Sequence, residues 1–279
     1  MRRTIQRPAE LAGTGLHTGA TVRLRVAPAR GGAGVRFRRI DLDPPVEIAA
    51  TLDAVGGTER RTVLAAGDTR IETVEHLLAA AAAAEIDDLL VLVDGPELPI
   101  LDGSFAPYCA LLSAGGILAV AGRRRALVVD APFEVREGDA RYLVEPAGGC
   151  RLEVTLEHVE PVIGRQHAVF APGDEPFVTA IAPARTYGFL AEVEALRARG
   201  LLAGASADAA IVLSATAPLN TTLRWPEEFA RHKVGDLLGD LALLGGPLRA
   251  AVRAWRPSHR GNIACARAIA ARARPVEEE

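Results

Sequence analysis

The order of the expected elements restricts the fold of this chain most strongly, because groups of strands are followed by helices twice over. Val22, Leu24 and Val26 alternate with arginines, which is typical of a half-buried strand, and residues 34–38 repeat the pattern. This order predicts an α+β chain of two similarly built halves. We expect helices at 71–84 and at about 188–199, 226–244 and 259–273, and further strands at 89–93, 126–129, 141–144, 151–156, 210–213 and 248–255.

Residues 119–125 are typical of a linker between the two halves. We therefore expect a first α+β domain at 1–121 and a second at 122–279. No sequence repeat relates them, so the duplication is inferred from element order alone. The basic run at 123–125 is interpreted as part of the solvated linker, and the tail at 275–279 is expected to fray.

Composition narrows the class of protein. Hydrophobic residues make up 49% and charged residues 24%, and the net charge of −3 does not favour a nucleic-acid partner. Three cysteines without a paired spacing indicate reduced thiols. No apolar signal segment begins the chain, and the longest apolar run, 77–84, is too short to cross a membrane. We expect a cytoplasmic globular protein with no transmembrane segment.

The expected helix at 226–244 carries an unusual group of ionisable side chains. His232 and Asp236 are four residues apart and therefore lie on one face, and Asp240 lies one turn further along. Lys233 falls on nearly the same stripe as Asp240, whereas the opposite face is rich in leucine. This spacing suits two metal ligands. The alternative is a surface ion pair, which is the commoner meaning of such a pair on a helix.

Glu75 and His76 begin a second, alanine-rich helix. Neighbouring helix positions point about 100° apart, so both side chains can border one cavity. His76 as a ligand and Glu75 as a base is one interpretation; a half-exposed charged helix edge is the other. With His232 and Asp236, His76 would complete a three-ligand set with an open position, as in catalytic zinc sites. Spacing alone does not show that the two helices meet.

Two further histidines have suggestive neighbours. His259 precedes a new apolar helix. One interpretation is a structural histidine at a helix start. The other is a general acid that protonates a leaving amine, with Asp240 as the carboxylate that keeps His259 charged. His17 lies in a glycine-flanked loop, where the glycines permit either a tight turn or close ligand approach. His158 and His167 are expected at the surface. The chain contains no GxGxxG, Walker, GxSxG or HExxH motif, which argues against nucleotide-dependent transfer, serine hydrolysis and the commonest zinc peptidases.

Several of these motifs occur together, in one order, in a known family. The chain resembles the UDP-3-O-acyl-N-acetylglucosamine deacetylases of lipid A biosynthesis from about residue 4 to residue 272. The resemblance depends on Gly15–Gly19, Thr73–Leu77, Leu101–Ser104, Ala184–Phe189, Arg231–Asp236 with Gly239 and Asp240, and His259 with Asn262.

The resemblance implies a role for each matching residue. His76, His232 and Asp236 would bind Zn²⁺, with Fe²⁺ as the alternative metal in the cell. Glu75 would be the general base, His259 the cationic general acid, and Asp240 the group that orients it. Lys233 and Thr186 would stabilise the oxyanion, and His17 is assigned to substrate binding.

The resemblance also implies a fold of two α/β-sandwich halves packed face to face with the active site between them. A small βαβ insert in the second half would form an apolar passage for a fatty acyl chain, lined by Phe189, Val193 and Leu202. The chain departs from the family pattern at Ser258, Tyr187 and the segment 158–161. These departures concern substrate contacts rather than the metal set.

We therefore predict a monomeric, zinc-dependent amidohydrolase. It would remove acetate from UDP-3-O-(3-hydroxyacyl)-N-acetylglucosamine, a UDP-linked acylated amino sugar, to give the free 2-amine in the committed step of lipid A biosynthesis. One alternative is a related zinc deacetylase of another N-acyl amino sugar. Another is a catalytically silent binding homologue with the same fold.

Overall fold

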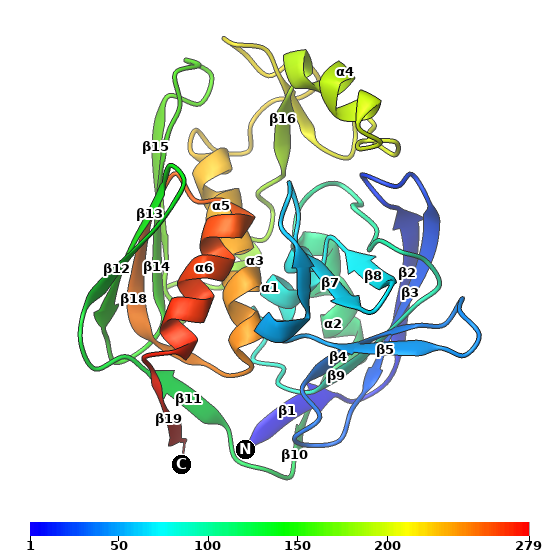
Figure 1. Cartoon of the computed structure of the whole chain (residues 1–279), viewed down its shortest axis with the longest axis vertical. Helices are drawn as coiled ribbons and strands as arrows, with labels where there is room; N and C mark the ends of the chain where they lie inside the picture. Colours follow the sequence, from blue (N-terminus) through cyan, green and yellow to red (C-terminus); the bar gives the residue numbers. More distant parts are fainter. Residues whose placement is uncertain (279) are drawn as a thin grey trace.

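The computed structural model, which describes residues 1–278, has two sheets as outer layers and helices between them (Figure 1). The helices α1 (Glu75–Ala83) and α2 (Ala106–Gly115) belong to the first half of the chain, and α5 (Glu228–Leu241) and α6 (His259–Ala270) to the second. The contact between α1 and α5 joins the two halves. This is the α+β architecture that the sequence predicts.

The first sheet has five strands in the order β2-β3-β9-β4-β5. Every second residue of β3 is buried, as its alternating sequence predicts, and these side chains share a core with the leucines of α1. A two-stranded sheet (β1 and β10) and a three-stranded sheet (β6 to β8) complete this half. The bounds are β1 Arg2–Ile5, β2 Ala9–Thr14, β3 Thr21–Pro28, β4 Val35–Arg39, β5 Val46–Ala49, β6 Val55–Gly57, β7 Val63–Ala66, β8 Thr69–Glu72, β9 Leu89–Val93 and β10 Ile117–Val120, with a 3₁₀ turn at Leu52–Ala54.

The second sheet has seven strands built around β18, which pairs with β11, β13 and β14. Helix α5 packs on β14 and β15, and α6 on β12 and β13, so the polar edges of both helices are left to face the first half. The bounds are β11 Arg125–Val128, β12 Phe133–Glu137, β13 Ala140–Pro146, β14 Arg151–Glu157, β15 Arg165–Phe170, β18 Leu248–Trp255 and β19 Arg274–Glu277, with α3 at Phe177–Ala180 and a 3₁₀ turn at Ala242–Leu244.

A small unit projects from the second half beside α5 (Figure 1). Strands β16 (Tyr187–Phe189) and β17 (Ile211–Leu213) pair in parallel, and α4 (Leu190–Ala198) connects them. The βαβ insert that the resemblance implies is therefore confirmed.

The structure differs from the sequence predictions in several elements. The helix expected at 71–84 begins only at Glu75, because residues 69–72 pair with β7 and Thr73 has a φ of 60°, outside the helical region. Helix α2 was not predicted. The tail does not fray, since β19 pairs with β11 over residues 274–277; Glu279 lies outside the described residues.

The basic run at 123–125 is also not merely solvated linker. The Arg124 side chain is only 13% exposed and forms ion pairs with Asp87 at 2.9 Å and Glu85 at 3.1 Å. The chain passes from β10 to β11 at this point, and we propose that the expected domain boundary at 121/122 lies here. None of the helices formed by residues 1–278 is both long and apolar enough to cross a membrane.

Candidate metal centre and active site

Two glycines of α5 allow the two central helices to meet. A Cβ atom added to Gly239 would overlap the carbonyl oxygen of Glu75, and one added to Gly235 would overlap the ring of Phe105. Because Gly239 lacks a side chain, the first turn of α1 lies directly against α5, and the same lack at Gly235 admits the ring of Phe105, which precedes α2. This contact brings Glu75 and His76 beside His232.

Three potential ligands converge where the helices touch. Asp236 Oδ1 lies 3.4 Å from His232 Nε2 and 3.7 Å from His76 Nε2. The ligand atoms of all three residues lie within 4.8 Å of one another, and none of these residues is more than 3% exposed. The ligand set that the sequence predicts is thus assembled in space, with two imidazoles from opposite halves.

The chemical state of these groups suits a divalent cation. Within the described chain, the buried Asp236 Oδ1 has no hydrogen-bond partner. His232 Nδ1 lies 3.0 Å from the Ala184 carbonyl oxygen, to which it can donate, so that Nε2 presents its lone pair to the cluster. Burial lowers the pKa of His232, and burial together with neighbouring His232 lowers the pKa of His76 to about 3. Two neutral imidazoles and a carboxylate oxygen without a partner fit a metal ion.

Packing fixes the orientation of these ligands. The Phe105 ring lies 4.5 Å from the His76 ring and 5.0 Å from the His232 ring, measured between centroids. Lys233 Nζ donates to Asp236 Oδ2 at 2.8 Å. Although burial opposes ionisation, the cationic and imidazole neighbours of Asp236 lower its pKa, and this carboxylate remains charged.

Glu75 is a buried carboxyl group with one oxygen held by a hydrogen bond and the other directed to His259. The backbone N–H of Thr62 donates to Glu75 Oε2 at 3.0 Å. The other oxygen, Oε1, lies 3.9 Å from His259 Nε2. Burial raises the pKa of Glu75 to about 7. This carboxyl can therefore exchange a proton near neutral pH.

The pKa of His259 is also raised, but in this residue the shift favours the charged form. Its Nδ1 lies 2.9 Å from Asp240 Oδ2. Burial lowers the pKa of His259, but the charges of Asp240 and Glu75 outweigh it and raise this pKa to about 9. His259 begins α6, and the hydroxyl of Ser258 accepts from the Gly261 N–H at 3.1 Å as an N-cap. Ser258, one of the departures from the family pattern, thus stabilises the start of the helix that carries His259.

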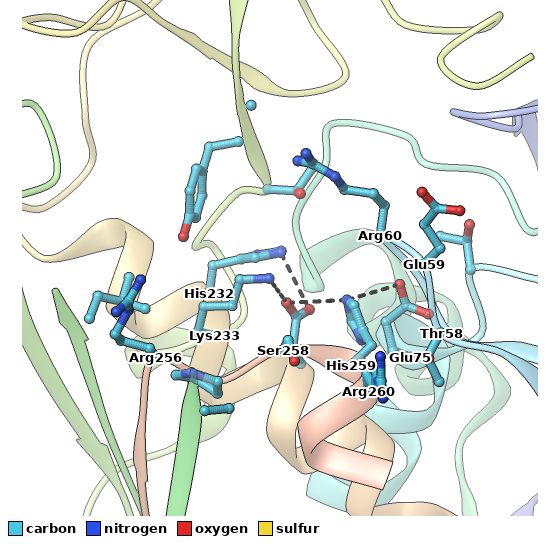
Figure 2. Close-up of a pocket in the computed structure, with 18 of the residues that line it drawn as sticks. Thr58, Glu59, Arg60, Glu75, His232, Lys233, Arg256, Ser258, His259 and Arg260 are labelled. Carbon is cyan, nitrogen blue, oxygen red and sulfur yellow. Dashed lines mark hydrogen bonds and ion pairs between the residues drawn. The ribbon is translucent and has the colours of Figure 1, made fainter. Parts of the chain in front are cut away.

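Glu75, His259 and the three potential metal ligands line one cavity of about 550 Å³. Figure 2 shows Glu75, His232, Lys233 and His259 turned toward one another there. Thr186 also lines the cavity. Its backbone N–H donates to the carbonyl oxygen of Gly103, and its own carbonyl oxygen accepts from the N–H of Ile211. The predicted oxyanion residues therefore border the same space as the predicted base and acid.

His17 lies at another side of this cavity in a loop folded around a buried carboxylate. Glu97 is 0% exposed and accepts hydrogen bonds from the backbone N–H groups of His17 and Thr18 and from the hydroxyls of Thr18 and Thr73. Burial lowers the pKa of His17 to about 4, so the imidazole is neutral. The glycine-flanked loop is therefore both a turn and part of the cavity wall, and the substrate-binding role of His17 stays a prediction.

The predicted acyl-passage residues are not all at the cavity. Phe189 lines it, whereas Val193 is half-buried on α4, and Leu202 packs on a separate small cluster with Leu16. The passage stays a prediction for all three. His158 is exposed, as expected, and it also borders the cavity beside Phe189, with ring centroids 6.2 Å apart.

Sequence reasoning missed several residues that shape the site. Thr62, Phe105 and Glu97 were not singled out, and Asn262 was noted without a role. The four-residue spacing of Gly235 and Gly239 is a signal that could have indicated close contact with another helix. Thr62 had no such signal, because its contacts with Glu75 and Asp240 arise only after long-range folding.

Comparison with known sequences gives one consistent result. The sequence model of a family described as UDP-3-O-acyl N-acetylglycosamine deacetylase matches residues 2–271. The chain is 42% identical over 271 residues to a UDP-3-O-acyl-N-acetylglucosamine deacetylase of Anaeromyxobacter sp. (strain Fw109-5), covering 97% of this chain and 88% of that protein. It is 40% identical over 269 residues to an enzyme of the same name from Thermosynechococcus vestitus, covering 96% and 94%.

Proposed function

The chain belongs to the UDP-3-O-acyl-N-acetylglucosamine deacetylase family, and we infer that it is a hydrolase that removes the N-acetyl group of UDP-3-O-acyl-N-acetylglucosamine. The products are acetate and the free 2-amine, in the committed step of lipid A biosynthesis. The observation that carries this inference is the three-ligand cluster beside an acid–base pair, Glu75 and His259. Both pKa values are raised, which favours the neutral form of the Glu75 carboxyl and the charged form of the His259 imidazole.

A divalent cation would be held by His76, His232 and Asp236. When bound, it supplies Lewis-acid polarisation of the acetamide carbonyl and makes water more acidic. Two imidazoles and one carboxylate are ligands that zinc accepts, and we propose Zn²⁺, with Fe²⁺ as the alternative. The predicted monomeric state remains part of this proposal.

Glu75 would act as the general base. Its free oxygen faces His259, and Glu75 lines the same cavity as the three potential ligands. A pKa near 7 leaves a useful fraction of the carboxylate ionised at neutral pH. The proton of the attacking water would pass to this oxygen.

Lys233 and Thr186 would stabilise the negative charge that develops on the carbonyl oxygen. Burial disfavours a charged Lys233, but neighbouring Asp236 raises the pKa of its ammonium group above the ordinary value, so the side chain stays cationic. A fixed positive charge in a buried site stabilises a developing oxyanion strongly, because little solvent must reorganise.

His259 would then protonate the departing nitrogen. Its Nδ1 is engaged by Asp240, so the proton on Nε2 is the one free to move. Nε2 faces Glu75 Oε1 at 3.9 Å and Asp236 Oδ2 at 3.8 Å, on the cavity side of the ring. Asp240 orients the imidazole and maintains its charge.

The test is acetate release by the purified metal-loaded protein, compared with Glu75→Ala and His259→Ala. Each variant is expected to lose about 10²- to 10⁴-fold in kcat, the usual contribution of a positioned acid or base. Metal content and thermal unfolding serve as controls for folding. Unchanged turnover in a folded variant would remove the role assigned to that residue.

A second measurement separates the proposed substrate from other N-acyl amino sugars. Phe189 at the cavity wall and the βαβ insert beside it support a passage for the acyl chain. We therefore expect UDP-N-acetylglucosamine without the 3-O-acyl group to be deacetylated far more slowly. Equal rates would favour a related deacetylase, and metal binding without turnover of either sugar would favour a silent binding homologue.

A further inference from the structure

Thr62 is a buried residue that contacts both predicted proton-transfer groups without bordering the substrate. It directly precedes β7 in the first half of the chain and is 0% exposed. Its backbone N–H donates to Glu75, whereas its hydroxyl donates to Asp240 and lies 3.4 Å from His259 Nδ1. No role was predicted for it from the sequence.

The backbone of Thr62 holds the predicted base. Its N–H donates to Glu75 Oε2 at 3.0 Å, and its carbonyl oxygen accepts from the Val74 N–H at 3.4 Å, next to the start of α1. With Oε2 engaged, the free oxygen Oε1 is the one that faces His259. This arrangement directs one defined oxygen of the carboxylate toward the reacting water.

The side chain of Thr62 holds the partner of the predicted acid. Its hydroxyl donates to Asp240 Oδ1 at 2.5 Å, a length typical of a hydrogen bond to a charged oxygen. The other oxygen, Oδ2, accepts from Asn262 Nδ2 at 2.8 Å and lies 2.9 Å from His259 Nδ1. Asp240 thus has both oxygens engaged, one by the first half of the chain and one by the second.

We propose that Thr62 is a positioning residue that fixes the base and the acid relative to each other across the contact between the two halves. The proposal rests on the proposed function, because it assigns Glu75 and His259 their roles. Glu75 is carried by α1, whereas Asp240 and His259 are carried by α5 and α6. A single residue bonded to both sides limits rotation of the two carboxylates relative to each other, and small displacements of catalytic groups reduce rates strongly.

The hydroxyl can be removed while the backbone contact is kept. Thr62→Val has nearly the same shape and retains the N–H, whereas Thr62→Ser restores a hydroxyl. We expect Thr62→Val to lower kcat about 10-fold or more with little change in KM, because the side chain is buried away from substrate, and we expect Thr62→Ser to recover most of the rate.

A double-mutant cycle distinguishes positioning through Asp240 from a general loss of stability. In an Asp240→Asn background, Thr62→Val should lower kcat much less than it does in the wild-type enzyme, because the acceptor of the Thr62 hydroxyl is already altered. Thr4→Val is the matched control: Thr4 is 1% exposed and its hydroxyl accepts from the Ala29 N–H at 3.0 Å, in β1. The Thr4→Val variant should lower the temperature of thermal unfolding but leave kcat unchanged.

The outcomes are distinct. Full kcat in folded Thr62→Val, or a loss that is the same in both backgrounds, overturns the role of Thr62 while the deacetylase remains. If Thr62→Val does not fold, Thr62→Ala is measured against Thr62→Ser by the same criteria. Lack of turnover by the metal-loaded wild-type protein overturns the proposed function and this inference with it.

Discussion

Helices α5 and α4 belong to the same half of the chain but are held in different ways. Every residue of α5 except Arg231 and Lys233 is buried, and the helix contacts α1, α6, β14 and β15. In α4 only Leu196 is buried. Two exposed ion pairs, Arg60–Glu192 and Arg199–Glu59, join the insert to the first half.

The difference in burial between α5 and α4 corresponds to the different roles proposed for them. Groups that bind metal and move protons need positions fixed to a fraction of an ångström, and packing on all sides provides this. A wall that accommodates a flexible acyl chain needs fewer fixed contacts. We therefore expect changes at α5 to affect chemistry and stability together, and changes at α4 to affect neither strongly.

Removal of the metal should have the largest effect. Chelation is expected to reduce acetate release to background, and added Zn²⁺ to restore it, because in the proposed mechanism the ion alone makes the attacking water more acidic and supplies the Lewis acid. Loss of the ion also leaves Asp236 Oδ1 buried without a partner. Hydrogen exchange should consequently accelerate in α5 and remain unchanged in α4. Full activity after complete metal removal, verified by elemental analysis, would contradict the site.

Gly239→Ala should break the contact between the two central helices. The added methyl group overlaps the backbone of Glu75, and we expect a loss of about 1–3 kcal/mol in unfolding free energy. Because Glu75 and His76 would be displaced from the ligands on α5, kcat should fall by about 100-fold. Gly148→Ala is the matched control, since a Cβ atom there meets nothing within 4 Å. Wild-type activity in Gly239→Ala would show that the close helix contact is not required.

The pH dependence of kcat should reflect the two tuned groups. Glu75 must be ionised, so the rate should rise with pH until about 7; His259 must be protonated, so the rate should fall above about 9. On each limb of the pH profile, kcat is expected to change about tenfold per pH unit. His259→Gln should abolish the basic limb, whereas variants of the insert should retain both. A basic limb that persists in His259→Gln would assign it to another group.

Removal of an ion pair at the insert should have the smallest effect. Arg199 and Glu59 have side chains 58% and 56% exposed, and exposed pairs of this kind contribute about 0–1 kcal/mol. Arg199→Ala should therefore leave kcat within about twofold and change KM only at low salt, where screening is weak. A large loss of kcat at physiological salt would mean that the insert helps to position the catalytic groups, and the contrast between α4 and α5 would fail.

The amino-acid sequence alone determined the local patterns. Alternation along residues 22–26 predicted β3, and the four-residue spacing of His232 and Asp236 placed both on one face of α5, because strand and helix periods depend only on nearby residues. The family motifs also singled out His76, His232 and Asp236, which the structure brings together. Even the boundaries of β9 and β18 agree with the predicted ranges.

Only the tertiary structure decided which of these segments meet. The approach of α1 to α5 depends on Gly239 facing the backbone of Glu75, and Gly235 of the same helix faces Phe105 at the start of α2. The tail was predicted to fray because its own sequence offers little burial, yet β11 supplies the hydrogen bonds that order it. Thr62 gained its contacts in the same way, from residues distant in the chain. Long-range contacts depend on the relative placement of whole elements, and no local pattern encodes that placement.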